Sequence, residues 1–472
     1  HGQGNWGSLD GDSAAAMRYC VTGDTLVMTD RGLIPIQTIS NKDEEKIHLG
    51  VLSYQGNKKT AVKFFNSGKH AITHLKTAHG YEIRGSKNHP VLCWDKNVFG
   101  TPCPQWKLLE EITTDDYVML YRANGLFSQN LPALASYHPQ RSTKEKHIGL
   151  PKRMTRDVAF LLGALVAEGS FHQNKVLFNN KDMNFYHRVK QATMNTFSGT
   201  TLFERDIKGD CREFELYHQQ AVRFLKAIGL KEVRSEKKEI PFTILQSPKS
   251  IQKIFLQALF EGDGSTHLNT DKRHGGKTLE LAYHTKSTIL IKQLKTVLLM
   301  FGVNTGKPYR DKRHECYKLQ ISGVENLRLF EREIGFVSRR KRDILAFARR
   351  MNSTRLSQND TIPFLNRYLR QNYPVAFVKK HNLDRYAKLT EHTATLSSIL
   401  SASDKKLVSW LLKNRYFFSK VESNEHTTIK ENVYSIKVDS SCHSFIANGF
   451  INHNTEAKMT PLAEELLADI EK

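Results

Sequence analysis

Two short segments near opposite ends of the chain carry side chains that can rearrange peptide bonds. Cys20 begins the string CVTGDT, and the triplet 453–455, His-Asn-Thr, ends the string SFIANGFINHNT. A cysteine thiol can attack the carbonyl of the residue before it, here Tyr19, and a hydroxyl can then accept the acyl group. An asparagine amide can cyclise onto its own carbonyl and break the chain after itself. Both cleavages need a proton donor, which a neighbouring histidine can supply.

A third segment adds a hydroxyl and an imidazole between these ends. The string GYEIRGSKNHPVL places Ser86 and His89 three residues apart, beside a predicted strand. Each signal is weak alone, because a lone cysteine is more often a small buried apolar residue and His-Pro often only begins a strand. The combination of the three segments predicts chemistry at the bonds before Cys20 and after Asn454.

The net charge changes at the same two bonds. The chain carries 70 Lys and Arg against 48 Asp and Glu, a net charge of +22. Residues 1–19 have two Asp against one Arg, and residues 455–472 have five acids against two Lys, so that residues 20–454 hold +26. Such an excess favours a polyanionic partner, nucleic acid before membrane. The pattern is that of one protein inserted into another.

Two similar strings in the basic middle of the chain each contain a helical run that ends in an acid followed by glycine. FLLGALVAEGSF (160–171) and FLQALFEGDGST (255–266) place Glu168 and Asp263 95 residues apart, after helical runs with small residues on one face. A carboxylate at a helix C-terminus is disfavoured by the helix dipole, so two acids meeting there would call for a divalent cation. Oxygen ligands suit Mg²⁺, and metal-activated water can cleave phosphodiesters. Two packed core helices with surface acids remain the alternative.

The elements that would position these residues fall into three patterns. Short β-rich runs between turns fill residues 20–122, a mixed α/β pattern extends from about 157 to 336, and residues 338–416 are helical and very basic. The length suggests about three domains. No apolar run approaches the roughly 18 residues of a membrane span. Six cysteines without a CxxC spacing indicate a reduced, cytoplasmic protein.

The whole arrangement resembles an intein, with residues 20–454 as the intervening element. CVTGDTLV, GSKNHPVL and HSFIANGFINHN are similar to the motif blocks of that family. The resemblance implies the following roles: Cys20 and Thr455 as first and second nucleophiles, Ser86 and His89 assisting the N–S acyl shift, His443 and His453 assisting cyclisation, and Asn454 cyclising. Ser86 replaces the commoner Thr, and Ser435 stands where many relatives have Asp. No metal or cofactor is implied for splicing.

The flanking residues, once joined, resemble a different family. They are similar to the active-site segment of the ATP-hydrolysing type IIA DNA topoisomerase A subunits, either gyrase A or topoisomerase IV A. This resemblance maps Tyr19 onto the tyrosine that attacks DNA, and it makes the host topoisomerase the extein partner. Only 37 host residues (1–19 and 455–472) are present, so the chain itself is not expected to act as a topoisomerase.

The repeated helices resemble the motifs of LAGLIDADG homing endonucleases. The resemblance implies that Glu168 and Asp263 are catalytic, bind Mg²⁺, and act on a long asymmetric site in double-stranded DNA, expected in an intein-free copy of the host gene. Lys318, in the string CYKLQI, is a candidate catalytic lysine, whereas the equivalent strand of the first half has Glu215. The basic runs 307–313 and 339–350 are candidates for phosphate contacts, with a solvated charged face as the alternative.

We therefore expect a mainly β Hint (hedgehog/intein) splicing domain with an inserted, monomeric α/β endonuclease of pseudo-two-fold symmetry and a basic helical DNA-binding region. The expected segments are an N-extein fragment (1–19), the N-terminal half of the Hint domain (20–150), the LAGLIDADG endonuclease (151–337), the helical region (338–414), the C-terminal half of the Hint domain (415–454) and a C-extein fragment (455–472). Two rivals remain open: a hedgehog-type module that cleaves without ligating, and an insert that binds DNA without cutting it.

Overall fold

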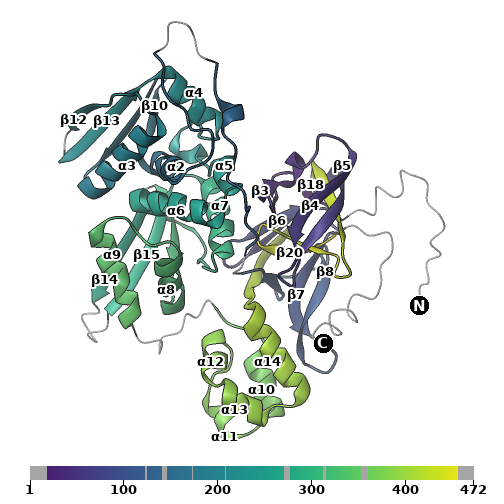
Figure 1. Cartoon of the computed structure of the whole chain (residues 1–472). Coiled ribbons are helices and arrows are strands. Elements are labelled where there is room, and N and C mark those ends of the chain that lie inside the picture. Colours follow the sequence, from purple (N-terminus) through teal and green to yellow (C-terminus); the bar gives the residue numbers. More distant parts are fainter. Residues whose placement is uncertain are drawn as a thin grey trace. The chain divides into compact units, whose positions relative to one another are not determined.

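The computed structural model describes residues 19–122, 125–140, 146–172, 174–207, 209–270, 277–311, 315–351 and 360–454 (Figure 1). These residues form two compact units, one on each side of boundaries at Leu126 and Gln358. The first unit combines the residues up to Leu126 with those from Asp360 onward, and the second contains Phe127 to Met351. None of the described helices has both the length and the apolar character that a bilayer crossing requires.

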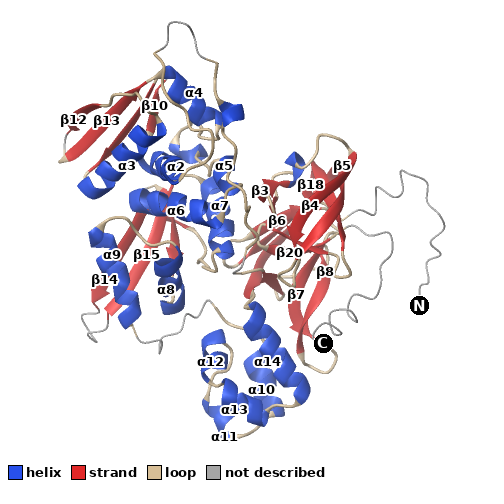
Figure 2. Ribbon diagram, in the orientation of Figure 1, coloured by secondary structure: helices blue, strands red, loops and turns tan. Residues whose placement is uncertain are grey.

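Among its described residues, the first unit contains twelve strands in one antiparallel sheet (Figure 2). Their bounds are β1 Val21–Thr22, β2 Leu26–Thr29, β3 Gly32–Pro35, β4 Glu44–Leu52, β5 Lys58–Thr77, β6 Glu82–Gly85, β7 Pro90–Lys96, β8 Pro102–Leu108, β9 Tyr117–Leu120, β18 Phe417–Asp439, β19 Ser444–Ala447 and β20 Phe450–His453. The order is β18-β1-β6-β5-β4-β2-β19-β20-β9-β7-β8, with β3 paired to β2.

The long strand β18 joins the two ends of the first unit. It pairs with β5, with β9 (Phe417 opposite Leu120) and with β1 (Val21 opposite Tyr434). The short strand β1 lies between β18 and β6, so the residue before it, Cys20, enters the middle of the sheet. The prediction of a mainly β domain made from both ends of residues 20–454 is confirmed.

Five helices among the described residues belong to the first unit, and the last of them, α14, packs on this sheet at β7. They are α10 Leu365–Asn372, α11 Ala376–Lys380, α12 Tyr386–Glu391, α13 Thr393–Ile399 and α14 Ala402–Asn414. The buried Trp94 indole donates to the Pro363 carbonyl (2.9 Å) and stacks on Trp410. The structure therefore divides the helical region predicted for 338–414, because residues up to Met351 fold with the second unit.

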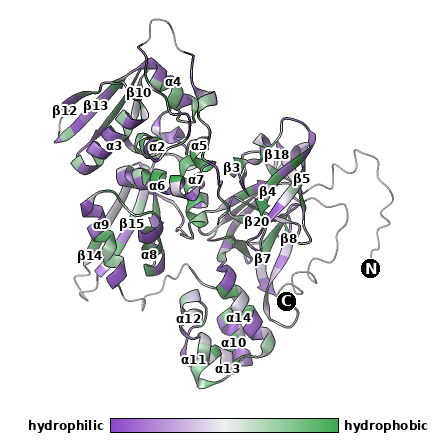
Figure 3. Cartoon of the chain, viewed as in Figure 1, coloured by the Kyte–Doolittle hydropathy of each residue, from purple (hydrophilic) through white to green (hydrophobic). Residues whose placement is uncertain are grey.

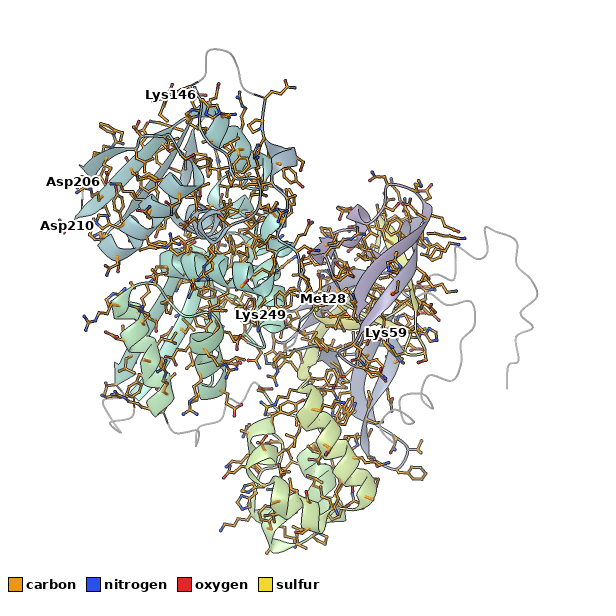
Figure 4. The ribbon with its side chains drawn as sticks, in the orientation of Figure 1. Met28, Lys59, Lys146, Asp206, Asp210 and Lys249 are labelled. Carbon is orange, nitrogen blue, oxygen red and sulfur yellow. The ribbon has the colours of Figure 1, made fainter. Side chains whose placement is uncertain are left out.

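The second unit repeats one helix-and-sheet pattern. Its described elements are α2 Arg156–Glu168, β10 Ser170–His172, β11 Lys175–Asn180, α3 Met183–Thr196, β12 Phe203–Ile207, β13 Cys211–Tyr217, α4 Gln219–Ala227, α5 Phe242–Leu245, α6 Lys249–Asp263, β14 Gly264–Thr270, β15 Lys277–Thr285, α7 Thr288–Met300, β16 Tyr309–Asp311, β17 Cys316–Ile321, α8 Val324–Glu333 and α9 Arg339–Ala346. The sheets β10-β11-β13-β12 and β14-β15-β17-β16 share one order. Figure 4 labels Asp206 and Asp210 near the β12–β13 turn. The predicted α/β pseudo-two-fold insert is confirmed.

Helices α2 and α6 cross in close contact at the centre of the second unit. Residues Val158 to Ala167 of α2 are all buried, as expected for a helix that is apolar on every side (Figure 3). A Cβ on Gly163 would lie 2.4 Å from the Phe255 carbonyl oxygen, and one on Gly262 would lie 2.5 Å from the Ala167 Cβ. Small residues therefore set the distance between the two backbones.

We predict that Gly163→Ala destabilises the second unit, although alanine normally favours a helix by about 1 kcal/mol over glycine. The added methyl group meets a backbone carbonyl, and overpacking of this kind typically costs about 1–3 kcal/mol. Thermal unfolding checks the sign of the change. Gly306→Ala is the matched control, because its Cβ would meet the nearest atom at 3.8 Å, an ordinary contact. An increase in stability for Gly163→Ala would contradict the packing described above.

Candidate functional site

The two ends of residues 20–454 meet in the core of the first unit. Cys20 and Asn454 are both buried, and the Tyr19 ring contacts the His453 ring edge-on at 5.7 Å between centroids. The strand β1 delivers Cys20 to this place, and β20, which ends at His453, delivers Asn454. Thr455 lies outside the described residues. The structure thus brings together side chains that are more than 400 residues apart in the sequence.

The Ser86 backbone and side chain hold the Cys20 peptide. The Cys20 amide donates to Ser86 Oγ (3.2 Å), and the Ser86 amide donates to the Cys20 carbonyl oxygen (2.9 Å). Gly85 permits this approach, because a Cβ there would lie 2.5 Å from the same carbonyl oxygen. Sequence reasoning found Ser86 but not Gly85, whose signal was only a glycine at the end of a strand.

The His89 imidazole is fully buried beside the bond that precedes Cys20. Its Nε2 lies 2.8 Å from Asn452 Oδ1, and Asn452 Nδ2 donates to the Phe450 carbonyl. The Asn452 oxygen must therefore accept, which places the imidazole proton on Nε2. Burial lowers the pKa of His89 to about 4, while Asn452 and the Tyr19 backbone act in the opposite direction. Asn452 was missed, because nothing distinguishes it from other strand residues.

At the other end, His453 lies against the carbonyl of Asn454. His453 Nδ1 is 2.7 Å from the Asn454 carbonyl oxygen, and Asn454 Nδ2 donates to the Val438 carbonyl at 2.9 Å. The Asn454 amide donates to the His443 carbonyl, and the His443 and His453 rings lie 5.8 Å apart. Burial, together with the nearby His443 and His89 rings, lowers the pKa of His453 to about 4, while the hydrogen bond to the Asn454 backbone acts in the opposite direction.

The second candidate site lies where α2 and α6 end. Burial raises the pKa of Glu168, and it raises the pKa of Asp263 to about 7, with the Glu168 charge adding to the rise. The Tyr283 hydroxyl donates to Asp263 Oδ2 at 3.2 Å. The two carboxylates thus lie near each other in a half-buried place, as predicted from the repeated strings.

Two lysines that sequence reasoning missed cap the same helices. Lys238 Nζ donates to the Ala167 carbonyl at 2.7 Å, and Lys341 Nζ donates to the Gly264 carbonyl at 2.8 Å. Burial lowers the pKa of both lysines, and nearby acids, Glu168 among them, oppose this. Each ammonium therefore offsets the negative helix end and the carboxylate beside it. Both lie far from their partners in sequence, so no spacing could have revealed them.

The catalytic lysine proposed from the sequence, Lys318, pairs with an acid other than Glu168 or Asp263. Lys318, on β17, forms an ion pair with Glu280 on β15, and Glu215 pairs with Lys175 at 2.6 Å. Lys341 belongs to the basic run 339–350 predicted to contact phosphates, yet it is buried and bonded to the end of α6. Charge alone did not separate the buried lysine of this run from its exposed neighbours.

The two carboxylates suit an oxygen-bound cation more than a His- or Cys-rich metal site. Within the ranges that the structure describes, no group of three or more His, Cys, Asp or Glu side chains is arranged to hold a metal ion. Mg²⁺ is typically bound by one or two carboxylates, with water and phosphate oxygens completing its shell. Glu168 and Asp263 match this donor set, and burial raises the pKa of both although Lys238 and Lys341 act in the opposite direction.

The chain belongs to the inteins: the family described as intein splicing domain matches residues 26–454. Over its whole length it is 32% identical to the DNA gyrase A protein of Mycobacterium gordonae, covering 83% of that sequence. It is also 32% identical to the DNA gyrase A protein of Mycobacterium leprae (strain TN), covering 36% of that protein. The predicted resemblance to an intein placed in a gyrase A sequence is thereby confirmed.

Solved structures align with this chain only at low TM-scores. The homing endonuclease I-DmoI in complex with DNA and Mn aligns with a TM-score of 0.28 and 18% identity, over 38% of this chain and 96% of that chain. A variant of the Ssp DnaB mini-intein aligns with a TM-score of 0.18 and 20% identity, over 22% of this chain and 64% of that chain.

We predict that His89 and His453 make the first unit sensitive to acid. Each has a folded pKa of about 4, below the ordinary value of 6.5, so the unfolded chain binds more protons between these values. Stability is complete above about pH 6.5 and falls as pH drops toward 4, by up to about 1.4 kcal/mol per pH unit for each histidine.

Urea unfolding between pH 7 and 4.5 measures this loss in a chain kept intact by Cys20→Ala and Asn454→Ala. His89→Gln should flatten the dependence, because glutamine does not gain a proton. His48→Gln is the control, since His48 is exposed. Equal acid sensitivity of the two glutamine variants would show that His89 is not buried in its neutral form.

Proposed function

We propose that this chain excises residues 20–454 by protein splicing in the cytoplasm. The observation that carries the proposal is the placement of Cys20, His89, His453 and Asn454 in one buried site, fed from both ends of the segment. Ligation needs both ends together, because the acyl group released at Tyr19 must reach the residue after Asn454.

The first step exchanges the bond between Tyr19 and Cys20. The Cys20 sulfur attacks the Tyr19 carbonyl carbon, the C–N bond breaks, and the thiol proton passes to the departing amine. With its pKa near 4, His89 is neutral at neutral pH and is able to take this proton and return it. Ser86 holds the Cys20 amide while its nitrogen changes from amide to amine.

The later steps take place at Asn454. The Thr455 hydroxyl attacks the thioester carbon and releases the Cys20 thiol. Asn454 Nδ2 then attacks its own carbonyl, breaks the bond to Thr455 and leaves a succinimide, and the freed amine takes over the acyl group. His453 Nδ1, 2.7 Å from the attacked carbonyl oxygen, is placed to stabilise the charge that develops there. Splicing would restore a Tyr-Thr bond in the host topoisomerase.

We predict that the segment from Cys20 to Asn454 ligates two reporter proteins placed on either side of it. Intact-mass measurement should find the joined reporters and the free segment. His453→Gln should slow cleavage after Asn454 by about 10²- to 10⁴-fold, the usual contribution of a positioned acid or base. The double variant Cys20→Ala, Asn454→Ala should remain as precursor. Separated reporters without any ligated product would instead favour a hedgehog-type module.

We further propose that the second unit is a homing endonuclease for double-stranded DNA. Two carboxylates lie at the ends of its paired helices, and residues 127–357 carry 41 Lys and Arg against 22 Asp and Glu, a net charge of +19. Most of the positive charge of the chain is therefore in this unit, which suits a long, asymmetric site with many phosphate contacts.

Glu168 and Asp263 would hold the Mg²⁺ ions, which supply a water of lowered pKa and polarise the scissile phosphate. The positive charge beside these ions comes from side chains of the protein. Lys238 and Lys341 place two ammonium groups beside the carboxylates, where they are able to offset the charge gained by the phosphate. These two lysines, rather than Lys318, are the ones we assign to the site.

The helices of residues 360–414 offer a further DNA contact. Their acids are engaged within the first unit: Asp360 pairs with Arg122, Asp404 accepts from Tyr368, and Glu391 pairs with Lys388. These helices also carry exposed basic residues, namely Arg367, Arg370, Lys379, Lys380, Lys405, Lys406 and Lys413. We propose that they bind phosphates.

We predict that Lys238→Met abolishes DNA cutting while Lys318→Met retains it. Cutting is measured on a plasmid that carries the joined host sequence, with Mg²⁺ present, and DNA binding is measured separately by gel shift. Asp263→Asn should bind DNA without cutting it, because it keeps the size of the side chain and removes its charge. An insert that binds the plasmid but never cuts it would support the DNA-binding alternative.

A further inference from the structure

The Cys20 thiol has a polar neighbour that lies outside the motifs discussed so far. Cys20 Sγ donates to Ser67 Oγ at 3.2 Å, across 47 residues of sequence. The hydroxyl belongs to β5, whereas Ser86, which holds the Cys20 backbone, follows β6. Two serines on different elements therefore hold the thiol and the peptide of the same residue.

A bulge in β5 presents Ser67 to the thiol. On β18, Tyr434 pairs with Asn66 and Asn432 pairs with Lys69, so that Ser67 and Gly68 together face one residue. Gly68 has a φ of +76°, and its amide donates to Asn66 Oδ1 at 3.2 Å. An extra residue in one strand redirects the side chains around it, and bulges often serve this purpose near active sites.

Apolar side chains also pack against Cys20. Cys20 packs with Ile72 and Val433 in a buried cluster. Continuing the pairing of Val21 with Tyr434 by one residue places Cys20 opposite Ser435, so the facing strand offers a hydroxyl and not a carboxylate. Ser67 is thus a hydroxyl in direct contact with the sulfur, beside the apolar side chains of this cluster.

We propose that Ser67 is a positioning residue that holds the Cys20 sulfur for its attack on the Tyr19 carbonyl, a role that rests on the splicing function proposed above. A hydroxyl both accepts and donates hydrogen bonds. It accepts from the thiol at rest, and after rotation it donates to the sulfur once the proton has left. The same contact therefore holds the sulfur before and during the formation of its bond to carbon, and no further reactant is needed.

The test measures the first step of splicing, at Cys20, separately from the last cleavage, after Asn454. In an Asn454→Ala chain, cleavage by added dithiothreitol reports thioester formation at Cys20. In a Cys20→Ala chain, cleavage after Asn454 reports the other end without the thiol. Ser67→Thr and Ser67→Val are the matched pair, because they have nearly the same shape and only threonine keeps the hydroxyl.

We expect Ser67→Val to slow thiol-induced cleavage about tenfold, the value of one hydrogen bond of about 1.4 kcal/mol. Ser67→Thr should stay within about threefold of the parent, and cleavage after Asn454 should be unchanged in both. Equal rates for Thr and Val, or an equal loss at both ends, would overturn the role of Ser67 while the parent remains active. A parent chain inert to the thiol would overturn the splicing function and this role together.

Discussion

The pairing of β18 with β1 is the interaction on which the splicing site depends. β1 has only two residues in strand conformation, and it is held between β18 and β6. Through this pairing a segment near the end of the chain fixes the backbone that follows Cys20. The same long strand leads to the β19–β20 hairpin, which carries His453 and Asn454. A site that must act on two bonds is thus built from one continuous hydrogen-bonded sheet.

Burial shifts pKa values at both sites, downward for the histidines of the first unit and upward for the acids of the second. In the first unit it keeps His89 and His453 neutral, and short contacts to Asn452 and to the Asn454 carbonyl fix their ring orientation. In the second unit it raises the pKa of two acids that the packing of α2 and α6 brings together, and Lys238 and Lys341 only partly offset this rise. A neutral site needs no ion, whereas a site with excess negative charge favours a cation.

Residue types at the ends of the segment were enough to predict the mainly β fold and to propose Cys20 and Asn454 as splicing residues, because these motifs are local. The partners that hold them were not predictable in the same way. Asn452 and Ser67 reach the site through sheet register and a bulge, and neither has a local signature. Lys341 sits inside a basic run whose composition suggested solvent or phosphate, and only its packing on α6 shows otherwise.

The place where the chain leaves the first unit and returns to it has a consequence for the history of the protein. The Arg122 guanidinium and the Asp360 carboxylate form an ion pair at 2.5 Å, so residues 238 positions apart in sequence are direct neighbours in the fold. The Leu126 amide, a few residues later, still donates to the sulfur of Met28, which is labelled in Figure 4. An insertion between these points breaks no strand pairing of the first unit, so each of the two proposed functions is free to be gained or lost without the other.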